Sequence, residues 1–167
     1  MRVISFIAAM VLASSTNAAC VNSLERQAPD SRFQINDATV TDTHTGLMWL
    51  RCPVGQKLNG DKCSIDTGQS ANFAWGQALQ VAMDASVAGF NDWRLPNKHE
   101  LSSIVDRSCS GPAVNEKAFP GAMVRGYWSS TPQRREEGYA WHVDFTTGIM
   151  LPRENSAIFG VLLVRNP

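Results

Sequence analysis

Hydrophobic residues are spaced for a helix in one part of this chain. Between residues 72 and 87 they lie at i, i+3, i+4, i+7 and i+8, at Trp75, Ala78, Leu79, Ala82 and Met83. This is the spacing of an amphipathic helix with one buried face. We predict that the helix has Asn72 as its N-cap and ends before Gly89.

A second, shorter helix is predicted directly after Pro96. Asn97 suits its N-cap position, and Glu100, three residues later, can complete a capping box. The buried face of this helix would hold Leu101, Ile104 and Val105.

Short runs with β propensity surround the two helices. They cover residues 39–42, 47–50, 127–130, 139–145, 149–151 and 161–164. The first two flank a predicted hairpin turn that contains Gly46, and the last is apolar and β-branched enough for a central strand. An early hairpin, two helices and a late, mainly antiparallel sheet predict an α+β fold.

In the run 139–145, large apolar residues alternate with smaller or polar ones, which predicts the face of the strand on which each residue lies. Tyr139, Trp141, Val143 and Phe145 alternate with Ala140, His142 and Asp144. We therefore expect His142 and Asp144 on a polar outer face. The alternative is a histidine–carboxylate pair from a catalytic triad. The sequence has no Gly-x-Ser-x-Gly motif, phosphate-binding glycine loop or His-Glu-x-x-His helix, so we do not expect an enzyme.

The first nineteen residues have the pattern of a signal peptide. Arg2 is followed by an apolar stretch and then by small residues up to Ala19. The stretch is only about half of the roughly 20 residues that a membrane-spanning helix needs. We predict an exported protein, periplasmic or extracellular, with a signal peptide over 1–19 and a single domain over 20–167. The alternative is a lipoprotein lipidated at Cys20, although Asn17 stands where a lipobox usually has Leu.

The four cysteines allow three pairings, and an oxidising compartment favours disulfides. Cys52 and Cys63 flank a short polar loop and form the first predicted pair, which leaves Cys20 with Cys109. A zinc site is the alternative, but the three histidines are too scattered along the chain for its ligand spacing.

Charge excludes one class of partner and indicates another. The formal net charge is zero, whereas a nucleic-acid binder needs a strongly basic surface. Guanidinium groups beside aromatic rings suit sulfate, carboxylate or sugar faces. The candidate ligand-binding residues are therefore Arg125, Arg134, Arg135 and Tyr139, in and around one polar loop.

No cofactor is required by any motif in the chain. Asn91, Asp92 and Asn97 could supply oxygen ligands to calcium. Their spacing fits turn formation and helix capping more simply, so we predict no metal site.

Several segments, taken in order, resemble one known family. They are residues 40–42, 45–49, Trp75 with Ala78, 92–97 with 100–101, 127–130, 140–141 with Val143 and Phe145, and 164–165. Together they are similar to the C-terminal domain family of the Legionella collagen-like protein (Lcl), in the group of C-type lectin-like folds that includes the formylglycine-generating enzyme.

This resemblance implies an α+β fold with a twisted antiparallel sheet, displayed at bacterial surfaces or in the periplasm. In the adhesin that names the family, the domain binds sulfated glycosaminoglycans. The present sequence contains no collagen-like repeat and is near neutral, and no cysteine follows Cys109 to serve the enzyme chemistry of the formylglycine relatives. We expect a carbohydrate- or polyanion-binding recognition domain. The alternative is a structural or assembly subunit of a surface appendage or envelope complex.

Overall fold

The computed structural model describes residues 19–69, 71–122 and 125–167. In chain order its elements are β1 (Ala19–Cys20), the 3-10 helix η1 (Asp30–Arg32), β2 (Phe33–Asn36), β3 (Thr39–Asp42), β4 (Met48–Leu50), β5 (Gln56–Asn59), β6 (Lys62–Ile65), α1 (Trp75–Met83), α2 (Lys98–Ser103), β7 (Cys109–Ser110), β8 (Gly126–Pro132), β9 (Tyr139–Asp144), β10 (Ile149–Glu154) and β11 (Val164–Arg165). The predicted signal peptide lies outside the described residues, except for Ala19.

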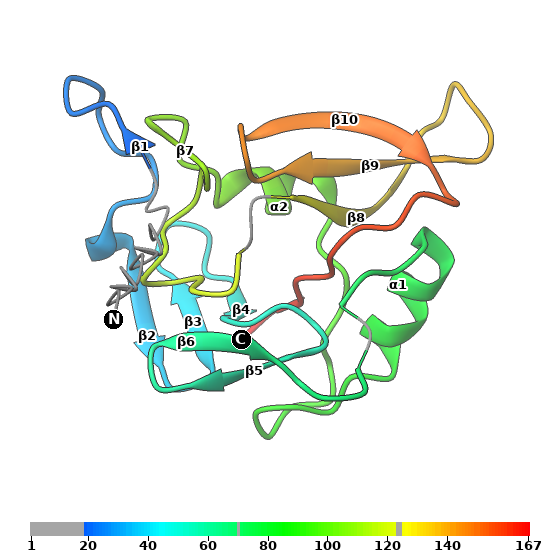
Figure 1. Cartoon of the computed structure of the whole chain (residues 1–167), viewed down its shortest axis with the longest axis horizontal. Helices are drawn as coiled ribbons and strands as arrows, with labels where there is room; N and C mark the ends of the chain where they lie inside the picture. The colour runs from blue at the N-terminus through cyan, green and yellow to red at the C-terminus, as the bar shows by residue number, and fades with distance from the viewer. Residues whose placement is uncertain (1–18, 70, 123–124) are drawn as a thin grey trace, which may run out of the picture.

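The described strands form two larger sheets and two small pairs. One sheet has the order β10-β9-β8 and the other has the order β11-β4-β3-β2, while β5 pairs with β6 and β1 with β7. Figure 1 shows the β8–β10 sheet at the top of the view and β2–β4 at the lower left. All of these strand pairs are antiparallel, and together with the two helices they confirm the predicted α+β fold.

Helix α2 forms where the sequence predicts it. The Asn97 side chain accepts hydrogen bonds from the backbone N–H groups of His99 and Glu100, and the Glu100 carboxylate accepts one from the Asn97 N–H at 2.8 Å. This reciprocal capping box satisfies N–H groups that would otherwise be unpaired at the helix start. Leu101 faces the interior and is fully buried, and the helix contacts β8 and β9.

Helix α1 is shorter than predicted at both ends. Its N-cap is Ala74 rather than Asn72, because Phe73 exchanges backbone hydrogen bonds with Phe159 and is held extended. The helix ends at Met83, well before Gly89, and a tight turn follows in which residues 87 and 90 bond to each other. Contacts with the C-terminal segment therefore override the helical periodicity at the start of α1.

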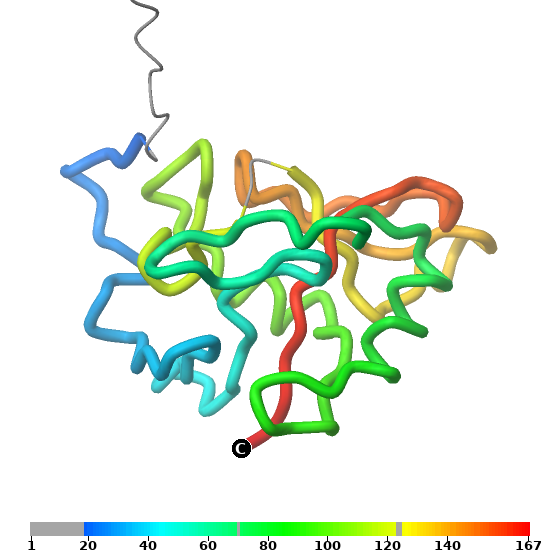
Figure 2. The backbone as a smooth tube through the Cα atoms, turned by 60° about the horizontal axis from the view of Figure 1, so that its bottom comes forward, coloured from blue at the N-terminus to red at the C-terminus, as the bar shows by residue number. Residues whose placement is uncertain are grey.

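A buried segment links the two large sheets. Residues 155–163 connect β10 to β11, and from residue 160 onward this connection is buried and runs through the middle of the molecule, as Figure 2 shows. The Leu163 carbonyl accepts from the Leu50 N–H, and the Gly160 carbonyl accepts from the Trp128 N–H, both at 3.0 Å. The predicted strand over 161–164 was therefore wrong for its first residues, because these carbonyls bond to different neighbours rather than to one ladder.

The first half of β9 faces opposite to the prediction, whereas the predicted burial of Val143 and Phe145 is confirmed. His142 is 3% exposed and Ala140 is fully buried, whereas Tyr139 and Trp141 are only partly buried. The His142 ring stacks on Phe159 with ring centroids 4.4 Å apart. The C-terminal segment covers the face that the alternation assigned to solvent, so His142 lies in the interior.

Both predicted disulfides are present. Cys52 is bonded to Cys63, and Cys20 to Cys109, and no described cysteine is free. The first bond joins the β5–β6 hairpin to the end of β4, and the second joins the N-terminal segment to the chain after α2. Large side chains fill the core between these elements, among them Trp49, Phe119, Tyr127 and Trp128.

Candidate functional site

The start of α2 and the end of β8 are joined by two backbone contacts. The Ser130 N–H donates to the Pro96 carbonyl at 2.8 Å, and the Lys98 N–H donates to the Thr131 hydroxyl at 3.1 Å. The polar loop between β8 and β9 begins after Pro132, the next residue. This loop is therefore placed beside the first turn of α2 by contacts between the end of β8 and the residues that open the helix.

A cavity of about 420 Å³ lies between this loop, α2 and β9. It is lined by Asn97, Lys98, His99, Thr131, Pro132, Gln133, Arg134, Arg135 and Trp141, and we call it the Arg134 cavity. Three of these residues carry a full positive charge, and among the described residues that line it none is acidic. An anionic group is the complementary ligand.

Lys98 and Trp141 form the inner side of the Arg134 cavity. The Lys98 ammonium lies 4.2 Å from the centroid of the Trp141 ring, which is a cation–π contact. Both side chains are partly buried, so the contact fixes the ammonium near the ring. The result is a localised positive charge next to an apolar aromatic edge.

Arg134 and Arg135 supply exposed donors to this cavity. Both side chains are exposed, and neither guanidinium has a hydrogen bond or an ion pair with another of the described residues. A guanidinium carries five N–H donors in a planar fork that matches two oxygens of a carboxylate or sulfate. These donors are therefore available to a ligand.

The other two predicted ligand-binding residues lie elsewhere. The Arg125 Nη1 donates to the Asn72 side chain at 2.7 Å, and its guanidinium lies 5.4 Å from the Tyr127 ring. The Tyr139 hydroxyl donates to the Glu154 carboxylate at 3.2 Å, and this hydrogen bond raises the pKa of Tyr139. The structure thus brings Arg134 and Arg135 into one cavity and places Arg125 and Tyr139 outside its lining.

Sequence reasoning missed the residues that complete the cavity. Lys98 and His99 looked like ordinary residues of a capped helix, and Trp141 was assigned to an apolar face. The available signal was a basic pair, Lys98-His99, directly after a helix cap. Only the pairing of α2 with β8 and β9 brings that pair beside Arg134.

Two of the three residues considered for calcium have other partners. Asp92 accepts two hydrogen bonds from Arg165, which lower the pKa of its carboxyl group. The Asn97 oxygen caps α2. Within the described part of the chain, no three His, Cys, Asp or Glu side chains group closely enough to hold a metal ion.

The two residues considered for a triad bond to backbone groups rather than to each other. His142 Nδ1 lies 2.7 Å from the Leu151 carbonyl oxygen in the interior. Asp144 is partly exposed, and its carboxylate accepts from the Thr146 N–H at 2.8 Å in the turn after β9. Each side chain is engaged by backbone groups of its own surroundings.

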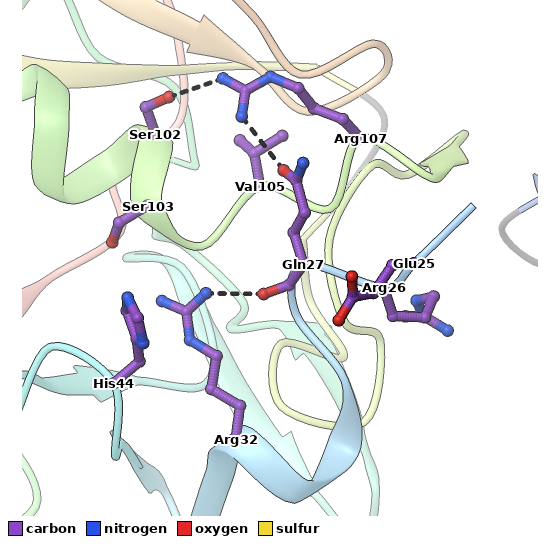
Figure 3. Close-up of a pocket in the computed structure, with 9 residues that line it drawn as sticks. All are labelled: Glu25, Arg26, Gln27, Arg32, His44, Ser102, Ser103, Val105 and Arg107. Carbon is purple, nitrogen blue, oxygen red and sulfur yellow. Dashed lines mark hydrogen bonds between the residues drawn. The ribbon is translucent and has the colours of Figure 1, made fainter.

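A second cavity of about 430 Å³ lies near the other end of α2. It is lined by Glu25, Arg26, Gln27, Arg32, His44, Ser102, Ser103, Val105 and Arg107, and we call it the Arg107 cavity. Figure 3 shows Arg32 and His44 on one side of it, with Arg107 and the two serines on the other.

Most of the charge in the Arg107 cavity is already compensated. Arg32 donates two hydrogen bonds to Asp42, and Arg26 is paired with the buried carboxylate of Asp106. Burial tends to raise the pKa of Asp42, but the Arg32 and Thr45 hydrogen bonds outweigh it and the pKa is lowered. The cations of the Arg134 cavity have no acidic partner in the described part of the chain, so this cavity is the stronger candidate site.

The comparisons with known proteins identify the family. Residues 38–165 match the Lcl C-terminal domain, which is most of the chain, so the protein belongs to this family. No curated protein matches the chain. Among the described residues, no helix is both long and apolar enough to cross a membrane.

Proposed function

We propose that this protein is an exported recognition domain that binds anionic glycans through the Arg134 cavity and does not transform them. The carrying observation is that Lys98, Arg134 and Arg135 converge on one cavity whose described lining has no acidic residue. The two disulfides support an oxidising location, since such bonds persist outside the cytoplasm.

Charge and shape at this cavity favour a sulfated or carboxylated sugar. Guanidinium forks bind planar oxyanions through paired hydrogen bonds, and an aromatic edge suits the apolar face of a sugar ring. A nucleic-acid partner is disfavoured because the chain as a whole has no net positive charge. The positive charge of the cavity therefore suits a ligand that makes a few ionic contacts, rather than a polymer that needs a broad basic surface.

The experiment compares binding of heparin fragments to wild type and to the double variant Arg134→Ala/Arg135→Ala. We expect the double variant to lose at least about tenfold in affinity, since each of the two substitutions removes a charge-assisted contact with the glycan. Wild-type binding should weaken as salt rises, because the cations are exposed. Titration calorimetry gives both quantities, and the recovered glycan should be chemically unchanged.

The matched control is Lys62→Ala/Arg153→Ala, which removes the same charge from exposed positions outside the cavity lining. The control should bind as wild type does. The proposal is wrong if wild type binds no sulfated or carboxylated glycan on an array, or if the control loses as much affinity as the cavity variant. Cleavage of the glycan would instead indicate an enzyme.

A further inference from the structure

The two cavities lie along one face of the same helix. His99 lines the Arg134 cavity, and Ser102 and Ser103 line the Arg107 cavity. Residues three and four apart in an α-helix are surface neighbours, so these three side chains share a face. Leu101 marks the opposite face and is fully buried.

We infer that the Arg134 and Arg107 cavities are the two ends of one extended site, which takes a linear polyanionic glycan laid along α2. This inference rests on the proposed function. Three residues of helix rise by roughly 4.5 Å, so only a short stretch of α2 surface separates the lining of one cavity from that of the other. A single sugar in one cavity leaves the other open, whereas a chain occupies both.

Arg107 provides the charge at the second end. Its guanidinium is exposed, and its partners among the described residues are neutral groups, the Gln27 side chain and the Ser102 hydroxyl, at 3.3 Å each. Figure 3 shows it reaching between these two residues at the edge of the cavity. A carboxylate or sulfate offers a charged partner in place of two long neutral hydrogen bonds.

The acidic residue of α2 between the two ends is already bound within the protein, and the acidic residue of the lining, Glu25, lies at the Arg107 end. The one acidic residue of α2, Glu100, is held by two hydrogen bonds from Arg94 at 2.7 and 2.8 Å. A further bond from the Asn97 N–H engages the same carboxylate. Although burial opposes it, this set of bonds lowers the pKa of Glu100 and keeps its charge compensated within the protein.

The Arg107 end is partly built by chain outside the family match. Gln27 and Arg32 line this cavity, and the match to the Lcl C-terminal domain begins only at residue 38. The preceding segment is fixed in place by the bond between Cys20 and Cys109 and by the pairing of Arg26 with Asp106. The N-terminal segment thus contributes part of the lining at this end, whereas Arg107 itself lies within the family match.

The test uses chain length together with Arg107→Ala. A heparin disaccharide should bind only through the Arg134 cavity, and a decasaccharide should bind through both. We expect the decasaccharide to bind wild type more tightly, because its second contact is made at high effective concentration. Arg107→Ala should weaken decasaccharide binding roughly tenfold and leave disaccharide binding unchanged.

Further variants separate this inference from the proposed function. Arg107→Lys should restore part of the loss, since it keeps the charge but not the fork. Arg153→Ala is the single-charge control and should bind both fragments as wild type does. If Arg107→Ala leaves decasaccharide binding unchanged while Arg134→Ala/Arg135→Ala weakens it, the extended site is wrong and the proposed function stands. If wild type binds neither fragment and no anionic glycan on the array, both are wrong.

Discussion

At the scale of single residues, His142 stands out because it is a titratable group in the core. Its ring is stacked on Phe159, and its Nδ1 lies 2.7 Å from the Leu151 carbonyl oxygen. That contact requires a proton on Nδ1, which leaves Nε2 without one in the neutral ring. Burial lowers the pKa of His142, so the folded protein favours the neutral form.

The lowered pKa of His142 makes the free energy of unfolding depend on pH within a defined range. Because the folded pKa of His142 is lowered, its contribution is fully present above the unfolded value of about 6.5 and is lost as pH falls toward the folded value. The lowered pKa values of Asp42 and Asp106 act in the same direction, but only below their ordinary value near 3.8. We expect the free energy of unfolding to decrease between about pH 7 and about pH 5.

Urea unfolding at a series of pH values measures this effect. His142→Gln removes the titrating group, so its unfolding free energy should be lower than that of wild type at neutral pH and nearly flat over the same window. His99→Gln, at an exposed position, is the control and should keep the wild-type slope. An equal slope in wild type and His142→Gln would assign the pH dependence to other groups.

At the scale of elements, α2 shows how a local sequence signal fixes a structure that the site depends on. Its six residues are too few for a stable isolated helix, so the cap and the packing against β8 and β9 must hold it. Asn97→Ala should lower the free energy of unfolding by about 1 kcal/mol, whereas Asn97→Ser, which can still cap, should lower it by less. Chemical denaturation measures both, and equal losses in the two variants would mean that capping is not the cause.

The elements also show what the sequence can and cannot predict. The α2 capping box and the hairpin around Gly46 were predicted correctly, because their signals lie within a few neighbouring residues. The start of α1 and the burial of His142 were not, because the segment that decides both, around Phe159, is distant in sequence. Hydrophobic periodicity identifies one buried face of a helix or strand. It cannot identify a second buried face that is covered by a segment distant in sequence.

The candidate site divides in the same way. Arg134 and Arg135 were found because a basic pair in a polar loop is visible in the sequence. Lys98 and Trp141 were not, because their contact at 4.2 Å joins α2 to β9. The site is assembled from α2, β9 and the loop before β9. A single sequence reveals only those site residues that are neighbours along the chain, here Arg134 and Arg135.

At the scale of the whole molecule, the N-terminal segment is held to the domain by one covalent bond and several polar ones. Besides the Cys20–Cys109 disulfide, the Asn115 side chain donates to the Ala28 carbonyl at 3.0 Å and to the Asp30 carboxylate at 2.8 Å. These contacts are buried or partly buried. Ala28 and Asp30 lie in the chain between Gln27 and Arg32, two residues that line the Arg107 cavity. The contacts should keep the segment docked even when the disulfide is absent, so its removal lowers stability without abolishing the fold.

The two disulfides should then differ in their contribution to stability. They join residues 89 and 11 positions apart, and the chain-entropy estimate gives about 4.5 and about 3 kcal/mol for loops of these sizes. We expect Cys20→Ser/Cys109→Ser to lose more unfolding free energy than Cys52→Ser/Cys63→Ser, and to show a larger denaturant m-value than wild type because its unfolded chain is less constrained. The hairpin variant is the internal control, since it removes the same two sulfur atoms from a short loop. A greater loss in the hairpin variant would mean that native contacts around Cys52 and Cys63, rather than loop length, dominate.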